Sequence, residues 1–239
     1  MGSSAADLTT RMLRHERVLV ACTVALLALF GWAFLLRGMP MGTMEPPLTA
    51  LIAMWWLMML AMMLPSAAPA VLLYSRVRQA RAGDARIVQT WVFLAGYLAV
   101  WLLFSIVAAL AQSLLTGSSM ALSTGAAQST VLILVGLFQL SPFKSACVNE
   151  CRSPGQFISS HWRAGWEGAV RLGIMHGAYC VGCCWMLMGL LFVGGVMNLL
   201  WVVALTVLVA AEKLLPWGVL LPKISGVALI LWGLFEALR

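Results

Sequence analysis

The feature that most constrains this chain is a series of seven long apolar segments separated by short polar stretches. They cover residues 18–36, 48–72, 91–115, 126–140, 169–192, 196–211 and 224–238. A helix needs about 20 apolar residues to cross a bilayer, so the fourth and seventh segments are short for this purpose. With 62% hydrophobic and only 10% charged residues, the composition excludes a soluble enzyme, a disordered chain and a fibrous protein. The sequence predicts an all-α, polytopic membrane helix bundle, a single domain over 1–239 embedded in the lipid bilayer.

The basic residues predict the orientation of these segments. Thirteen of the 15 Lys and Arg residues fall on one side of the predicted bundle, and only Arg37 and Arg239 fall on the other. Cytoplasmic loops carry an excess of Lys and Arg, so we expect seven spans with a cytoplasmic amino terminus and a carboxyl terminus outside. The net charge of +7 is then explained by topology, and no basic patch remains for nucleic acid. The longest polar segment, 141–168, is predicted to be a cytoplasmic loop.

The fifth segment carries the clearest chemical signal. If it is helical, His176, Cys180, Cys183 and Cys184 stand at positions i, i+4, i+7 and i+8 and share one face. Thiolate and imidazole ligands suit Cu(I) and Zn(II), so this stripe predicts a metal site completed by neighbouring spans. Three alternatives stay open: the thiols are apolar filler, they form a disulfide, or they carry out redox chemistry. On the same segment, Gly173 and Gly177 form a GxxxG step that favours close approach of a neighbouring helix.

The second segment carries a methionine stripe at Met54, Met58 and Met62, with Met59 and Met63 beside it. Counting 1.5 Å per residue from the outer ends places these sulfurs level with those of the fifth segment. Thioether and thiolate together favour Cu(I), whereas zinc would be favoured if no methionine contacts the site. The alternative is that the stripe only fills the core.

Two further candidates lie toward the cytoplasmic side. Glu212, at the inner end of the sixth segment, is predicted to orient the imidazole of His176 without itself binding the metal. The alternative is that it forms an ion pair with Lys213 or Arg171. Cys147 and Cys151 have CxxxC spacing in the 141–168 loop and would form an i, i+4 pair if helical. We interpret this pair as a station for metal passing through the loop, because a structural disulfide is disfavoured in a reducing compartment.

The run HGAYCVGCCWMLM, from His176 to Met188, resembles the signature of a bacterial family of predicted metal-binding integral membrane proteins, some of them labelled copper chaperones. Other stretches similar to that family are 61–66, 147–154, 195–201 and 212–216, so the likeness covers roughly residues 50–220. The resemblance implies a multi-pass protein of the bacterial inner membrane that binds a metal, with copper as the labelled ion. It implies no reaction.

The leading hypothesis is therefore a membrane protein that binds Cu(I) and hands it to a copper-receiving protein or holds it. A membrane copper oxidase or monooxygenase is a weaker hypothesis, because only His176 of the three histidines lies inside a predicted span. A thiol redox protein and a structural subunit are the remaining alternatives. The sequence favours a protein that is not an enzyme, without deciding the question.

Overall fold

The computed structural model describes residues 2–37, 47–82, 88–115, 125–196 and 198–239. These residues form helices joined by turns, which confirms the predicted all-α class. The helices are α1 (Gly2–Arg37), α2 (Leu48–Ala82), α3 (Val88–Leu115), α4 (Gly125–Gln139), α5 (Pro142–Arg152), α6 (Pro154–His161), α7 (Gly165–Gly189), α8 (Leu191–Gly194), α9 (Leu199–Leu214) and α10 (Leu221–Ala237).

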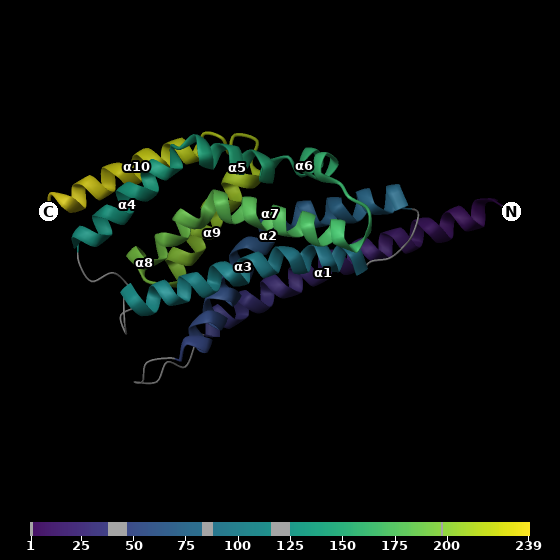
Figure 1. The fold of residues 1–239 in the computed structure, drawn as a ribbon, viewed down its shortest axis with the longest axis horizontal. Helices are drawn as coiled ribbons and strands as arrows, with labels where there is room; N and C mark the ends of the chain where they lie inside the picture. Colours follow the sequence, from purple (N-terminus) through teal and green to yellow (C-terminus); the bar gives the residue numbers. More distant parts are fainter. Residues whose placement is uncertain (1, 38–46, 83–87, 116–124, 197) are drawn as a thin grey trace.

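The main bundle consists of α1, α2, α3 and α7, which lie side by side along the long axis of the molecule (Figure 1). The close approach of α3 to α7 depends on glycine. A Cβ on Gly173 would lie 2.1 Å from the carbonyl oxygen of Phe93, and one on Gly177 would lie 3.0 Å from the Cβ of Val100. The predicted GxxxG contact is confirmed, and its partner is α3.

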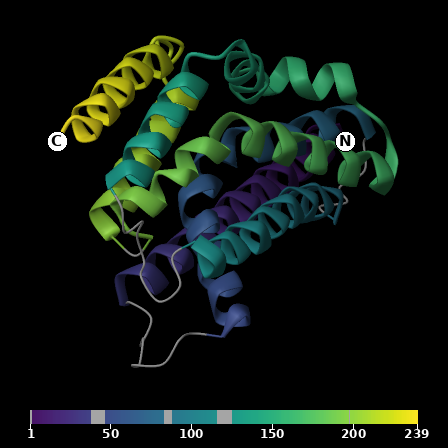
Figure 2. The ribbon, with the colours of Figure 1, turned by 60° about the vertical axis from the view of Figure 1, so that its left-hand side comes forward.

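A second unit is formed by α4 and α10, which pack against each other at the carboxyl-terminal end of the molecule (Figure 1). From the end of α4 the chain bends by 62° into α5. Figure 2 shows α5 and α6 lying along one side of the bundle, next to α7, before the chain returns into α7. Gly165, at φ +87°, makes the turn into α7 with a backbone conformation that other residues rarely adopt.

Among the described residues, four helical stretches are long and apolar enough to cross a membrane: Val18–Arg37, Leu48–Arg81, Val88–Leu114 and Gly165–Gly194. The bent pair of α4 and α5 would be a fifth if it counts as one broken span. Apolar side chains such as Leu26, Leu103 and Leu231 are exposed on the outside of the bundle, as lipid-facing residues would be. With 16 and 17 residues, α9 and α10 are shorter than these stretches, so seven spans and their orientation stay a prediction.

The segment 141–168 differs from the loop expected from the sequence. It folds into α5 and α6, which pack on α2, α7 and α9. Ser141 caps α5 by accepting a hydrogen bond from the backbone N–H of Lys144 at 3.2 Å, and Pro142 occupies its first turn. Pro154 begins α6 directly after Ser153, because proline interrupts a helix where it cannot donate a backbone hydrogen bond. The side of the membrane on which these helices lie stays a prediction.

Three of the basic residues counted toward topology have internal roles. Lys144, Lys213 and Arg78 are buried. The ammonium of Lys144 pairs with Glu212 at 2.7 Å, and the guanidinium of Arg78 pairs with Glu16 at 3.1 Å. Burying a cation costs free energy unless such a partner is present. The positions of these basic residues therefore reflect packing inside the bundle in addition to the predicted membrane topology.

Candidate metal centre

The predicted cysteine stripe lies on α7, and the helical register expected from the sequence is confirmed. His176, Cys180, Cys183 and Cys184 are all buried, with exposed fractions of 3% or less. The thiols of Cys183 and Cys184 donate to the carbonyl oxygen of Cys180, at 3.1 Å and 2.8 Å. Two of the three α7 thiols are thus held one helical turn toward the carboxyl end of α7 from Cys180.

Both cysteines of α5 lie against this stripe on α7. The sequence had predicted that they form a separate metal-binding position in the loop. The side chain of Cys151 lies within interaction range of the thiols of Cys180 and Cys183. Cys147 lies against α7 at Gly182, where an added Cβ would be 3.1 Å from its sulfur. The i, i+4 spacing of the CxxxC motif directs both sulfurs toward α7 because α5 is helical. We define the thiol cluster as Cys151, Cys180, Cys183 and Cys184.

A methionine from α2 reaches the thiol cluster. The sulfur of Met63 lies 3.9 Å from the sulfur of Cys184. Eight residues before Met63, the ring of Trp55 packs 5.4 Å from that of Phe192, which lies eight residues after Cys184. These two contacts show that α2 and α7 run level with each other, as the depth count predicted.

The predicted stripe of Met54, Met58 and Met62 is fully inside the bundle. All three side chains are buried, with exposed fractions of 1% or less. Among the described residues, the methionine in contact with a cluster thiol is Met63, on a neighbouring position of the same helix. The three predicted residues are therefore placed in the core of α2, and their contact with a metal stays a prediction.

Cys180 has two polar neighbours that the sequence did not identify as part of the site. The ammonium of Lys213, on α9, donates to the Cys180 sulfur at 3.0 Å. The hydroxyl of Tyr97, on α3, lies 3.2 Å from the same sulfur. Lys213 had a detectable signal, because an ionisable residue in an apolar segment is a functional candidate by default. Tyr97 had none, since one tyrosine in an apolar helix is ordinary.

His176 lies in an aromatic environment, one helical turn before Cys180 on α7. The rings of Phe93, Tyr97 and Phe157 surround it, with centroids 6.1, 5.7 and 5.5 Å away. Its Nδ1 is buried and has no hydrogen-bond partner among the described residues. A buried nitrogen without a hydrogen-bond partner is uncommon and costs free energy. The Nδ1 of His176 is therefore a candidate group for binding a ligand.

Glu212 lies away from the imidazole that it was predicted to orient. Its carboxylate accepts from Lys144 at 2.7 Å and from the amide of Gln139 at 2.9 Å. No hydrogen bond joins it to His176 in the part of the chain that the structure describes. Its ion-pair partner there is Lys144, and neither Lys213 nor Arg171, the two partners suggested by the sequence, pairs with it. Gln139 also donates to Ser225 at 2.8 Å, so this buried network ties α4, α5, α9 and α10 together.

The donor set fits a soft cation better than a hard one. Thiols, a thioether and an imidazole are the ligands of Cu(I), whereas hard divalent ions prefer carboxylates and carbonyls. Within the described ranges, no three His, Cys, Asp or Glu side chains are arranged around one point as a metal site requires. An ion held here would need the thiols to turn toward each other, or would take fewer of them together with Met63.

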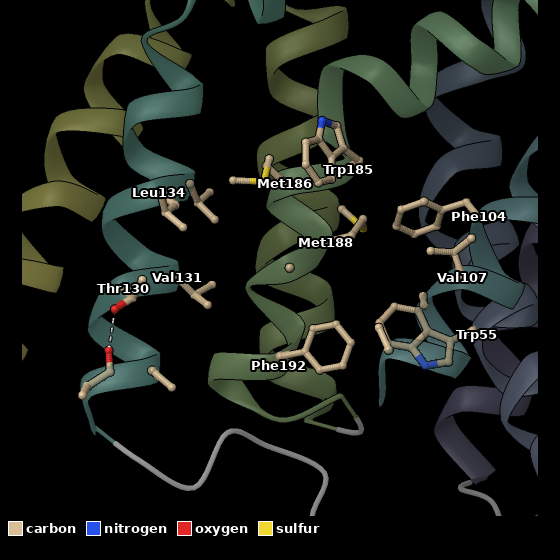
Figure 3. A pocket seen from close by; sticks show the side chains of 16 residues that line it. Trp55, Phe104, Val107, Thr130, Val131, Leu134, Trp185, Met186, Met188 and Phe192 are labelled. Atoms are coloured by element: carbon tan, nitrogen blue, oxygen red, sulfur yellow. Dashed lines mark hydrogen bonds between the residues drawn. The ribbon is translucent and has the colours of Figure 1, made fainter. Parts of the chain in front are cut away.

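An apolar cavity of about 650 Å³ lies between α4 on one side and α2 and α3 on the other (Figure 3). Leu134 and Val131 of α4 form one wall, Trp55 of α2 and Phe104 of α3 form the other, and Met188 projects between them. Met188 lies one helical turn after Cys184 on α7. The residues described around the cavity include no acid, base or cysteine, so the space suits apolar groups rather than a hydrated ion.

A protein-family model described as "Copper chaperone" (PpoB2) matches residues 52–236. The chain belongs to this copper chaperone family. The matched range begins in α2 and ends in α10, and it contains the thiol cluster, Met63, Lys213 and Glu212. The family resemblance seen in the sequence is thereby confirmed, and copper is the ion that the family description names. No curated protein and no solved structure matches the chain.

Proposed function

We propose that this copper chaperone family member binds Cu(I) in the membrane through the thiol cluster and Met63, and passes the ion to a copper-receiving protein. The observation that carries the proposal is the convergence of Cys151 from α5 and Met63 from α2 on the α7 thiols. Sulfur ligands from three helices lie together at one level of the bundle, and the chain belongs to a family described as copper chaperones. Neighbouring soft ligands also favour stepwise exchange, which transfer of an ion requires.

Cu(I) is proposed over Zn(II) because of the thioether. Zn(II) is bound by Cys, His and carboxylates, and methionine is a poor ligand for it. The protein purified in detergent under anaerobic, reducing conditions should bind Cu(I), measured by elemental analysis and by competition with a chromogenic chelator. Protein that takes up zinc but no copper under these conditions would replace the proposal with a zinc site.

The thioether itself is tested by exchanging methionine for leucine, which has similar volume and no sulfur. Met63→Leu should weaken Cu(I) affinity about tenfold, a loss of about 1.4 kcal/mol. Met59→Leu, a buried neighbour on α2, is the matched control and should leave the affinity unchanged. A loss of Cu(I) affinity in Met58→Leu, with no loss in Met63→Leu, would instead favour the methionine stripe predicted from the sequence.

We also propose the topology expected from the sequence, seven spans in the bacterial inner membrane with a cytoplasmic amino terminus. The short helices α4, α9 and α10 would supply the three spans beyond the four long stretches. Reporter fusions after Gly83 and Arg163 should read cytoplasmic, and those after Ser119 and Arg239 periplasmic. A periplasmic signal at Arg163 would place α5, α6 and the inner part of α7 on the opposite side.

A second candidate function has one observation in its favour. The cavity lined by Trp185 and Met188 has the size and lining of a site for an apolar small molecule, which a membrane copper oxidase or monooxygenase would need. Deleting the protein separates the two functions. Altered copper tolerance, or poor loading of a copper enzyme, supports transfer, whereas loss of oxidation of an apolar compound with normal copper handling supports the enzyme.

A further inference from the structure

Lys213 is a buried cation placed among sulfur atoms. Its side chain is 7% exposed, and its ammonium lies 3.0 Å from the sulfur of Cys180. It also interacts electrostatically with all members of the thiol cluster, including Cys151 across the interface between α5 and α7. A fixed positive charge beside a set of cation ligands is unexpected, because it repels the ion that those ligands would hold.

The usual neutralising partner of a buried lysine is absent from the described surroundings of Lys213. The adjacent acid, Glu212, is engaged by Lys144 and Gln139 on the other side of α9. In the part of the chain that the structure describes, no other carboxylate forms an ion pair with Lys213. The charge of Lys213 is therefore directed at the sulfur cluster and at whatever ion the cluster holds.

We infer that Lys213 makes the cluster selective for soft monovalent cations over divalent ones. This inference rests on the proposed copper site. The repulsion between the ammonium and a bound ion is proportional to the charge of the ion, so it is twice as large for Zn(II) as for Cu(I) at the same distance. In a low-dielectric bundle this difference is large, and it adds to the preference of sulfur ligands for Cu(I).

A ratio of affinities isolates this effect. Lys213 also stabilises thiolates, and removing it would weaken binding of either ion through those thiolates. Dividing Cu(I) affinity by Zn(II) affinity in one variant cancels the part of this loss that both ions share. The charge-dependent repulsion, which differs between the two ions, remains in the ratio.

The experiment measures Cu(I) and Zn(II) affinities of the full-length protein in detergent by chelator competition, for wild type, Lys213→Met and Lys213→Arg. Lys213→Met should lower the Cu(I)-to-Zn(II) affinity ratio about a hundredfold. Lys213→Arg keeps the charge and should stay within about threefold of wild type. Lys223→Met, which removes an exposed lysine from α10, is the control for loss of a positive charge and should leave the ratio unchanged.

The outcomes separate this inference from the proposed function. Wild-type protein that binds no Cu(I) would overturn both. Wild-type protein that binds Cu(I), with an unchanged ratio in Lys213→Met and in a second variant, Lys213→Gln, would overturn the selectivity alone. Should neither variant fold, wild-type protein that binds Zn(II) as tightly as Cu(I) would overturn it as well.

Discussion

The triple variant Cys180→Ser, Cys183→Ser, Cys184→Ser is expected to retain about a tenth or less of the Cu(I) bound by wild type, because a hydroxyl is not a soft ligand. Serine keeps the size of the side chain and can donate to the Cys180 carbonyl as the thiols do at 2.8 and 3.1 Å. The fold should therefore persist while the metal is lost. Copper per protein, measured after purification under reducing conditions, checks the expectation.

Two further cysteines make this test specific. Cys22→Ser removes an exposed thiol on α1 and should leave copper content unchanged. Cys151→Ser removes the α5 member of the cluster and should lower Cu(I) affinity, which would show that α5 contributes to the site. If the triple variant binds as much copper as wild type, the thiols are not the ligands, and redox chemistry or simple packing becomes their explanation.

Lys144→Met should destabilise the protein by about 3–5 kcal/mol, because it leaves the carboxylate of Glu212 buried without its cation. The side chains of this pair are 0% and 2% exposed, and their ion pair measures 2.7 Å. The free energy of unfolding, measured by denaturing detergent in mixed micelles, is the readout. Lys223→Met, at an exposed position of α10, is the matched control and should change stability little.

The double variant Lys144→Met, Glu212→Met distinguishes a broken ion pair from lost packing. Removing both charges leaves no buried unpaired ion, so most of the lost stability should return. A double variant as unstable as Lys144→Met alone would mean that the shape of the lysine side chain, and not its charge, holds α5 against α9. Because Glu212 belongs to this network, we expect Glu212→Gln to act on stability rather than on the imidazole of His176.

Residues that lie together because they share one helix were predictable from the sequence. The stripe of His176, Cys180, Cys183 and Cys184 follows from the helical repeat alone, and the structure places all four on a buried face of α7. The GxxxG step predicted a close helix contact for the same reason. The level of α2 relative to α7 also followed, because rise per residue converts position in a span into depth.

The residues that met across helices were not predictable in the same way. The contact of Met63 with Cys184 could not be read from the sequence, since the rotation of α2 about its axis is set by its packing partners and not by its own periodicity. The register of α5 on α7 depends on a 62° bend after α4, and no local sequence pattern predicts this bend. Cys151 was therefore expected in a separate loop station, although it lies in the thiol cluster.

The sequence by itself determined the all-helical class, the family and the sulfur-rich face of α7, because composition and helical periodicity are local properties. Only the tertiary structure decided which charges pair. Glu212 and Lys213 are adjacent in the chain, yet neighbours on a helix point in different directions. One therefore reaches Lys144 and Gln139 while the other reaches Cys180. The placement of a cation in the thiol cluster is a consequence of that packing.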